Sequence, residues 1–176
     1  MHATRRVLAH LVVPAATALL ATLGAATTAS ATPSQAAAEV CEDICIDDVR
    51  AATHTGYDRV VFDLGAGPLP TVTASHSTSP GFMTPGGEPS QIRTLGSSYL
   101  YLNFKDAEAG DFSETNPSPE LFNLPTVKAS QLLWWTSNIL GFTPETAFGI
   151  TLNGPVSRYN VFTLTQPNRV VVDIYR

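Results

Sequence analysis

Apolar and polar side chains alternate along much of this chain, most clearly in the segment from Ser97 to Phe104. At the two-residue period of a β-strand, this segment has an apolar face and a second face that carries Tyr99, Tyr101 and an asparagine. The pattern predicts a strand that turns one face toward a core. The residues of the apolar face are Leu100, Leu102 and Phe104.

Two segments far apart in the sequence read almost identically, Arg59 to Leu64 and Arg169 to Ile174. Each begins with arginine, continues with a run rich in valine, and has an aspartate four residues after the arginine. In each, the arginine and the aspartate share one face with a valine between them, while the other face is wholly apolar. The repeat predicts two similar strands within one all-β domain.

Two placements of these strands are compatible with the pattern. They pair directly as antiparallel neighbours, or they occupy equivalent positions in two different sheets that a pseudo-twofold axis relates. Direct pairing with Arg59 opposite Asp173 also sets Asp63 opposite Arg169, and these two pairs of opposite charges would fix the register. Chance similarity is the remaining explanation, because valine-rich strands that end in aspartate are common.

The rest of the chain has short strand-like segments between Pro- and Gly-rich loops, and no segment shows convincing helical periodicity. Residues 129–138 are ambiguous between a strand and a short helix, whereas 75–91 and 106–125 read as long loops. The C-terminus is predicted to be a hairpin that begins with 159–164. Other strands are expected at 47–53, 70–74 and 147–152. The predicted fold is a small antiparallel β-sandwich of two packed sheets with long loops, and the repeat allows it pseudo-symmetry.

The first 31 residues read as a secretory signal peptide. Arg5 and Arg6 provide a positive start, and an apolar run follows from Val7 to Leu23. The small residues Ala29 to Ala31 then form an A-x-A cleavage site. We therefore expect this segment to be removed during export.

The mature chain is expected to begin at Thr32, with a flexible leader over 32–46 and one domain over 47–176. The leader contains Cys41 and Cys45, and an even cysteine count in an exported protein suggests a disulfide. The loop between them is very short, so the disulfide should stabilise the fold only weakly. The alternative is a C-x-x-x-C metal or redox site, which would lack a second cysteine pair and a histidine cluster.

The composition is acidic and excludes some classes of partner. The formal net charge is −5, and it becomes −7 after signal cleavage because that segment carries two arginines and no acidic residue. An acidic chain with few lysines is a poor match for nucleic acid or an anionic membrane surface. No second apolar run is long enough to span a membrane. We expect no nucleic-acid partner and no membrane span after signal cleavage.

No local sequence pattern supports catalysis. After signal removal the remaining histidines are His54 and His76, and the G-x-S-x-G, phosphate-cradle and H-E-x-x-H motifs are absent. Glycosidases use a pair of carboxylates, but the fifteen acidic residues provide many pairs by chance. The sequence therefore predicts a protein that is not an enzyme, with no catalytic residue, no metal ligand and no cofactor.

Aromatic side chains favour a binding function. Tyr99 and Tyr101 would present two adjacent phenol rings if their face of the sheet is open to solvent. Trp134 and Trp135 fall on opposite faces of a strand, which leaves one of them near the surface. Exposed aromatic rings suit sugar rings or the apolar side chains of a partner. The alternative is that these residues fill a second core between the sheet and the loops.

Segments near both ends of the domain resemble the AMIN and AMIN-like domains of bacterial cell-envelope proteins. The similarity spans about 49–176 and rests on Thr55 to Asp63 and on Arg158 to Ile174. The resemblance implies two small antiparallel sheets packed together. It also implies a non-catalytic role, in which the domain targets an envelope protein to peptidoglycan or to neighbouring cell-wall machinery. The loops at 75–91 and 106–125 look expanded relative to this family.

We therefore expect an exported, non-catalytic envelope protein that binds peptidoglycan or another cell-wall component. Its expected location is extracytoplasmic, in association with the cell wall. The alternatives are a protein–protein interaction module that recognises a secreted or envelope partner, and a small secreted hydrolase. The candidate ligand-binding residues are Tyr99, Tyr101, Trp134, Trp135, Arg59 and Arg169.

Overall fold

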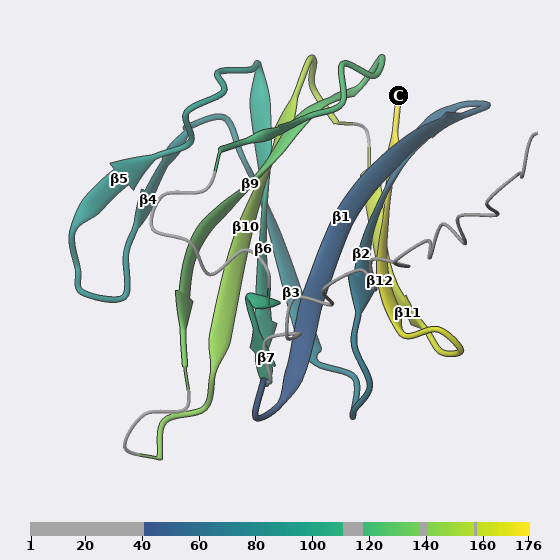
Figure 1. Ribbon diagram of the computed structural model, residues 1–176. Helices are drawn as coiled ribbons and strands as arrows, with labels where there is room; N and C mark the ends of the chain where they lie inside the picture. The colour runs from purple at the N-terminus through teal and green to yellow at the C-terminus, as the bar shows by residue number, and fades with distance from the viewer. Residues whose placement is uncertain (1–40, 111–117, 138–140, 157) are drawn as a thin grey trace, which may run out of the picture. The chain divides into compact units, whose positions relative to one another are not determined.

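The computed structural model describes residues 41–110, 118–137, 141–156 and 158–176, so the predicted signal peptide lies outside the described residues. The described chain contains twelve β-strands and no helix. Ten of these strands form two five-stranded sheets that pack face to face, and two form a separate short hairpin (Figure 1). The predicted all-β sandwich is confirmed.

The first sheet has the strand order β11-β12-β2-β1-β7 and contains both copies of the repeated segment. Its neighbours are antiparallel except for β1 and β7. The predicted C-terminal hairpin is confirmed as β11 and β12. Strand β1 begins within the predicted leader, because Ile44 and Ile46 are fully buried in the core. The strands are Ile44–His54 (β1), Tyr57–Leu64 (β2), Ala107–Glu108 (β7), Arg158–Leu164 (β11) and Arg169–Tyr175 (β12).

The second sheet has the strand order β3-β6-β10-β9-β8, and all of its neighbours are antiparallel. The segment that was ambiguous between strand and helix forms β9, between β10 and the short edge strand β8. The strands are Thr71–Ser77 (β3), Ser98–Lys105 (β6), Glu120–Leu121 (β8), Val127–Thr136 (β9) and Glu145–Leu152 (β10).

The segment 75–91 is more ordered than the predicted long loop. It contains the end of β3 and a hairpin of β4 (Gly81–Met83) and β5 (Pro89–Gln91). A tight turn closes this hairpin, in which the Gly87 amide donates to the Thr84 carbonyl at 2.9 Å. Gly87 has a φ of 81°, a conformation that glycine adopts without a steric penalty. The Ser-, Pro- and Gly-rich composition predicted a long loop over this segment and did not reveal the two short strands.

Three phenylalanines from the two sheets meet at the centre of the core. The ring of Phe62 on β2 lies 4.9 Å from that of Phe104 on β6 and 5.0 Å from that of Phe148 on β10. All three are tilted or edge-on to one another, the geometry that aromatic pairs prefer. The alternation predicted for β6 is confirmed, because its apolar face lies in this core.

The two repeated strands pair directly, in the predicted register. Arg59 lies opposite Asp173 and Asp63 lies opposite Arg169 in the β2–β12 ladder. The Arg59 guanidinium donates to both carboxylate oxygens of Asp173, at 2.6 and 2.8 Å. The second predicted ion pair is wrong, because Arg50 on β1 donates to both oxygens of Asp63, at 2.6 and 3.0 Å. The placement in two different sheets is also wrong.

A buried carboxylate joins the two sheets at one end of the sandwich. Asp58 on β2 faces inward and is fully buried, and its Oδ2 accepts the backbone amides of Thr126 and Val127 at 2.6 and 3.0 Å. Arg176 donates to its Oδ1 at 3.0 Å. Burial raises the pKa of Asp58, but hydrogen bonds from Thr53, the two amides and Arg176 outweigh it and lower the pKa overall. The carboxylate is therefore ionised, and its hydrogen bonds join β2 to the start of β9.

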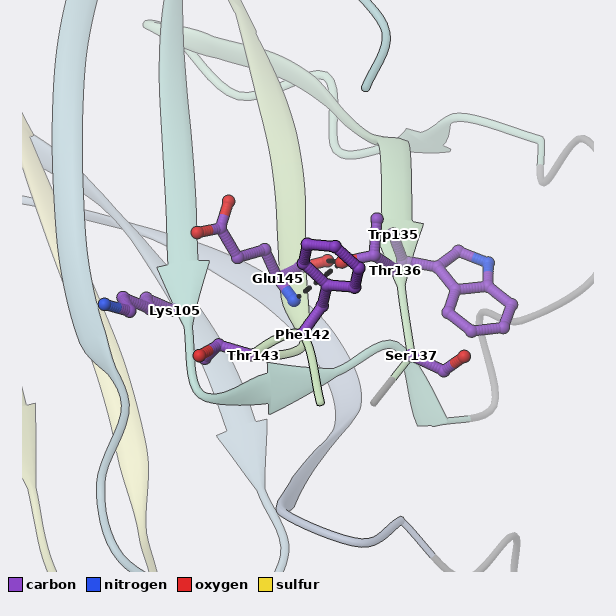
Figure 2. Close-up of a pocket in the computed structure, with 7 residues that line it drawn as sticks. All are labelled: Lys105, Trp135, Thr136, Ser137, Phe142, Thr143 and Glu145. Atoms are coloured by element: carbon purple, nitrogen blue, oxygen red, sulfur yellow. Dashed lines mark hydrogen bonds between the residues drawn. The ribbon is translucent and has the colours of Figure 1, made fainter. Parts of the chain in front are cut away.

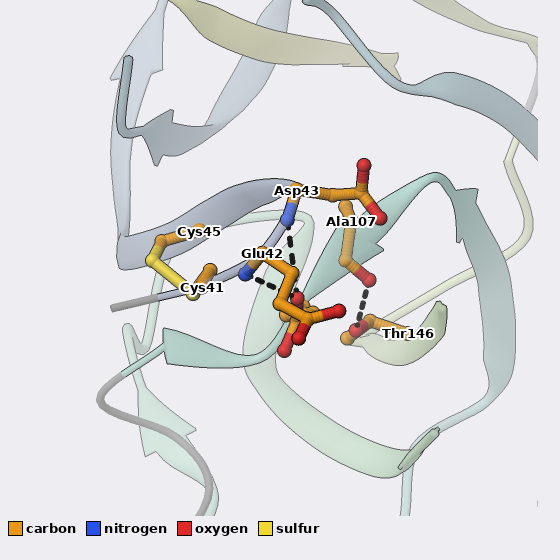
Figure 3. The surroundings of a disulfide bond; sticks show 7 residues. Cys41, Glu42, Asp43, Cys45, Ala107 and Thr146 are labelled. Carbon is orange, nitrogen blue, oxygen red and sulfur yellow. Dashed lines mark hydrogen bonds between the residues drawn. A yellow bond between two sulfur atoms is a disulfide. The ribbon is translucent and has the colours of Figure 1, made fainter. Parts of the chain in front are cut away.

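The predicted disulfide between Cys41 and Cys45 is present in the structure (Figure 3). Within its loop, the backbone amides of Glu42 and Asp43 both donate to Oε1 of Glu108, at 2.8 and 3.2 Å. The loop thus docks on β7 immediately before β1 begins. An oxidised pair of this kind fits an exported protein.

Replacing Cys41 and Cys45 with serine should lower the free energy of unfolding by at most about 2 kcal/mol, because so short a loop constrains the unfolded chain little. Urea unfolding of the wild type and the double variant measures this loss. Mass spectrometry of the wild type without reductant should show two hydrogens fewer than the reduced chain. Two free thiols, or a loss as large as that of a core residue, would contradict this account.

Candidate binding site at the end of the second sheet

Five of the six residues predicted to bind a ligand lie in three places in the structure. Tyr101 and Trp134 line a groove on the outer face of the second sheet, and Trp135 lines a larger pocket beyond the ends of β9 and β10. Arg59 and Arg169 lie on the outer face of the first sheet. The arginines therefore do not share a site with the aromatic residues.

Tyr99 does not present its ring to solvent, so that expectation is wrong. Only 2% of its surface is exposed. The segment that follows β5 covers this end of the face, where the Gly96 amide donates to the Tyr99 hydroxyl at 3.0 Å. Ile92 of the same segment is also fully buried. For Tyr99, the alternative of a second core between the sheet and a loop is correct.

A pocket of about 750 Å³ lies beyond the ends of β9 and β10. Its aromatic members are Trp135, which is 38% exposed, and Phe142, which is 71% exposed. Figure 2 shows the Phe142 ring beside Thr136 and the Trp135 indole projecting away from β9. The remaining described lining is polar and comprises Lys105, Thr136, Ser137, Thr143 and Glu145. We call this the end pocket, and its volume lies in the range of small-molecule sites.

The strand geometry explains why neighbouring tryptophans line different depressions. Trp135 pairs with Thr146 and Trp134 with Ala147, so the two indoles leave opposite faces of β9. Immediately before them in β9 the ladder shifts register, which marks a β-bulge at Leu133. Immediately after Trp135, the Glu145 amide donates to the Thr136 hydroxyl at 3.1 Å, which holds the end of β9 against the start of β10.

The groove on the outer face is smaller, about 230 Å³, and its aromatic members are Phe82, Tyr101 and Trp134. The Tyr101 hydroxyl donates to the carbonyl of Ser79 at 2.8 Å, so the half-buried phenol ties β6 to the segment before β4. Burial, with a smaller effect from a neighbouring tyrosine, raises the pKa of Tyr101, and the hydroxyl stays protonated as this bond requires. Phe82 belongs to β4, so the β4–β5 hairpin contributes to the lining of the groove.

A polar contact between described residues connects the two depressions. Asn103 lines the groove, and its side-chain amide donates to the carboxylate of Glu145, which lines the end pocket, at 3.4 Å. The Oδ1 atom of Asn103 is buried and has no hydrogen-bond donor among the described residues. This contact links the groove, where Trp134 leaves the outer face of β9, to the end pocket, where Trp135 leaves the opposite face.

The chemistry of the end pocket suits binding. Lys105 and Glu145 are register partners on β6 and β10 and place one cation and one anion at the rim. Its hydroxyl groups can donate and accept hydrogen bonds.

Within the described residues, no three His, Cys, Asp or Glu side chains are placed to hold a metal. The same part of the chain has no helix long and apolar enough to cross a membrane.

Sequence reasoning missed two aromatic residues of these sites, Phe142 and Phe82. Phe142 follows Gly141, which has a φ of 80°, and the Phe142 ring is 71% exposed in the turn before β10. An aromatic residue within a Gly- and Pro-bearing turn was an available signal. Phe82 belongs to a strand that the loop-like composition of its segment concealed.

The comparisons with known proteins agree with this architecture. No curated protein matches the sequence, and no solved structure matches the fold. The AMIN-like domain family matches over residues 45–176, which include both sheets of the sandwich. Because this match covers most of the chain, the protein belongs to the AMIN-like domain family, a family of extracytoplasmic cell-envelope domains.

Proposed function

We propose that this protein is an exported, non-catalytic envelope protein that binds peptidoglycan or another cell-wall glycan through the end pocket. The observation that carries the proposal is the pair of exposed rings, Trp135 and Phe142, beside a rim of hydroxyl and charged groups. Membership of an envelope domain family supports the same class of ligand.

The arrangement matches the two surfaces of a sugar ring. The faces of a pyranose ring carry C–H groups that pack on aromatic rings, and its edge carries hydroxyl groups that need hydrogen-bond partners. Trp135 and Phe142 provide the first kind of contact. Thr143, Ser137 and Glu145 provide the second. An apolar ligand would leave these polar groups without partners.

The neighbouring groove supports a polymeric ligand. Trp134 and Tyr101 provide a second set of aromatic rings next to the end pocket, past the Asn103–Glu145 contact. A single sugar fills only one of these depressions, whereas a glycan strand can lie along both. Two linked contacts raise the overall affinity for a polymer above that for its fragments.

Sedimentation with purified peptidoglycan tests this proposal. We expect saturable retention that decreases only modestly with added salt, because stacking and neutral hydrogen bonds are screened less than ion pairs. The suspension should not release soluble fragments during incubation. Release of fragments would contradict the non-catalytic part of the proposal, and no saturable retention would contradict the glycan as ligand.

The exposed rings also allow a second function, the recognition of a secreted or envelope protein. Phe142 is the most exposed large apolar side chain among the described residues, and exposed aromatic groups occur at protein interfaces as well as at sugar sites. Under this function the protein would fail to sediment with peptidoglycan. A specific envelope protein would instead co-purify with it, and Phe142→Ala would abolish that association.

A further inference from the structure

A second binding surface lies on the outer face of the first sheet, away from both aromatic depressions. A pocket of about 340 Å³ there is lined by three arginines from three adjacent strands, Arg50 on β1, Arg59 on β2 and Arg169 on β12. We call it the arginine pocket. Its positive lining contrasts with a chain whose formal net charge is −5.

Two of the three guanidinium groups are already neutralised. Arg59 makes two hydrogen bonds to Asp173, and its guanidinium also lies 5.5 Å from the ring centre of Tyr57. Arg50 makes two hydrogen bonds to Asp63. These contacts hold both side chains in place and use the forked face of each guanidinium.

Arg169 differs from its two neighbours. The carboxylate opposite it in the ladder, Asp63, is bound by Arg50, so Arg169 has no carboxylate partner among the described residues. Its Nε donates to the carbonyl of Pro167 at 3.2 Å. That bond orients the guanidinium and leaves its two terminal amino groups without an acceptor in the described structure. Arg169 is thus a fixed, uncompensated cation that lines a pocket.

The lining beside the arginines contains one further polar side chain, His54, whose ring stacks on that of Tyr57 with ring centres 4.8 Å apart. The other lining residues are apolar, and they favour one kind of anion over another. Val61 and Val171 form the floor, and Ala52 and Leu164 stand exposed at its edges. A phosphate group carries oxygen on every side and gains nothing from such walls. A carboxylate at the end of a peptide places two oxygens toward a guanidinium and small apolar side chains behind them.

We propose that the arginine pocket binds the free C-terminal carboxylate of a short peptide that ends in small apolar residues, with Arg169 as the binding residue for the carboxylate. The site lies on the opposite sheet from the end pocket and shares no lining residue with it. Failure of one proposal therefore leaves the other standing.

Titration calorimetry with N-acetyl-alanyl-alanine, and with the same peptide as its C-terminal amide, tests this site. The free acid should bind saturably, and the amide at least about tenfold more weakly, because it loses the charge-assisted pair. Arg169→Gln should weaken binding of the acid by a similar factor. Arg169→Lys should bind the acid more tightly than Arg169→Gln but more weakly than the wild type, since lysine keeps the charge but lacks the planar, forked guanidinium.

Arg158→Gln is the matched control, because Arg158 lies on the same sheet face over the Tyr175 ring but does not line the pocket. It should leave the affinity within about twofold of the wild type, and Trp135→Ala should do the same. Equal binding of acid and amide would overturn the proposal. So would equal losses in the Arg158 and Arg169 variants, or displacement of the peptide by an equal concentration of inorganic phosphate. Unchanged melting curves show that each variant is folded.

Discussion

Replacing Asp58 with alanine is expected to lower the free energy of unfolding by about 3 kcal/mol, one of the two largest effects that we predict for a single residue. The substitution leaves the buried amides of Thr126 and Val127 without an acceptor, and each unsatisfied buried donor costs about 1–3 kcal/mol. It also removes one of the hydrogen-bond acceptors of Arg176, which donates to Thr53 and to the His54 carbonyl as well. That part of the loss is smaller, because the arginine side chain is 41% exposed.

Urea unfolding at neutral pH measures this effect, with Glu120→Ala as the matched control because Glu120 is an exposed acid. The control should change stability by less than about 0.5 kcal/mol. Equal losses of stability for the two substitutions would mean that the hydrogen bonds of Asp58 between the two sheets do not stabilise the fold.

The same residue gives the fold a defined response to acid. Hydrogen bonding lowers the pKa of Asp58 in the folded state, despite the opposing effect of burial. Its contribution is therefore complete above the unfolded-state pKa of about 3.9 and is lost as the pH falls through the lower folded-state pKa. The stability difference between the wild type and Asp58→Asn should narrow below about pH 4. A constant difference down to pH 2 would contradict this.

The second large effect concerns the pair Arg59 and Asp173. Asp173→Arg should lower the free energy of unfolding by about 2–3 kcal/mol. The substitution removes the charge-assisted hydrogen bonds of a largely buried carboxylate, and it places a second cation opposite Arg59. Arg59→Asp should cost less, since the Arg59 side chain is 31% exposed. The double variant should recover part of both losses, with a coupling energy above about 0.5 kcal/mol.

The pair of Arg50 and Asp63 provides the comparison for this cycle. It has the same two-bond geometry, but its side chains are 53% and 29% exposed. Its coupling energy should therefore be smaller, within about 0.2–1 kcal/mol. Strictly additive losses for Arg59 and Asp173 would show that their contact does not help to set the register.

The strand pattern predicted most of the fold because alternation records which face of a strand is buried. It identified the apolar face of β6 and the register of β2 against β12, where matching charge spacing left few alternatives. It did not predict that Asp63 would pair with Arg50, because the pattern within one strand does not show which strands are its neighbours in the sheet. Asp58 was missed although the alternation of β2 extends to it and places it inward.

The candidate site was predicted less well, because its parts depend on loops. Trp134 and Trp135 were correctly assigned to opposite faces, since this follows from strand geometry alone. The sequence left open whether Tyr99 is exposed or part of a second core, because a strand does not show whether a later segment covers its second face; the structure buries it. Phe142 completes the end pocket from a turn whose position depends on how β9 and β10 meet.

Comparing the adjacent tryptophans tests the proposed glycan site most directly. The measurement is the affinity for a soluble disaccharide fragment of peptidoglycan, by titration calorimetry, for the wild type, Trp135→Ala and Trp134→Ala. If the end pocket binds the sugar, Trp135→Ala should weaken binding by about 2 kcal/mol, or roughly 30-fold, with a nearly unchanged melting temperature. Trp134→Ala should bind within about threefold of the wild type, because the fragment is too short to reach the groove as well. Wild-type affinity in Trp135→Ala, or equal losses in both variants, would contradict the account.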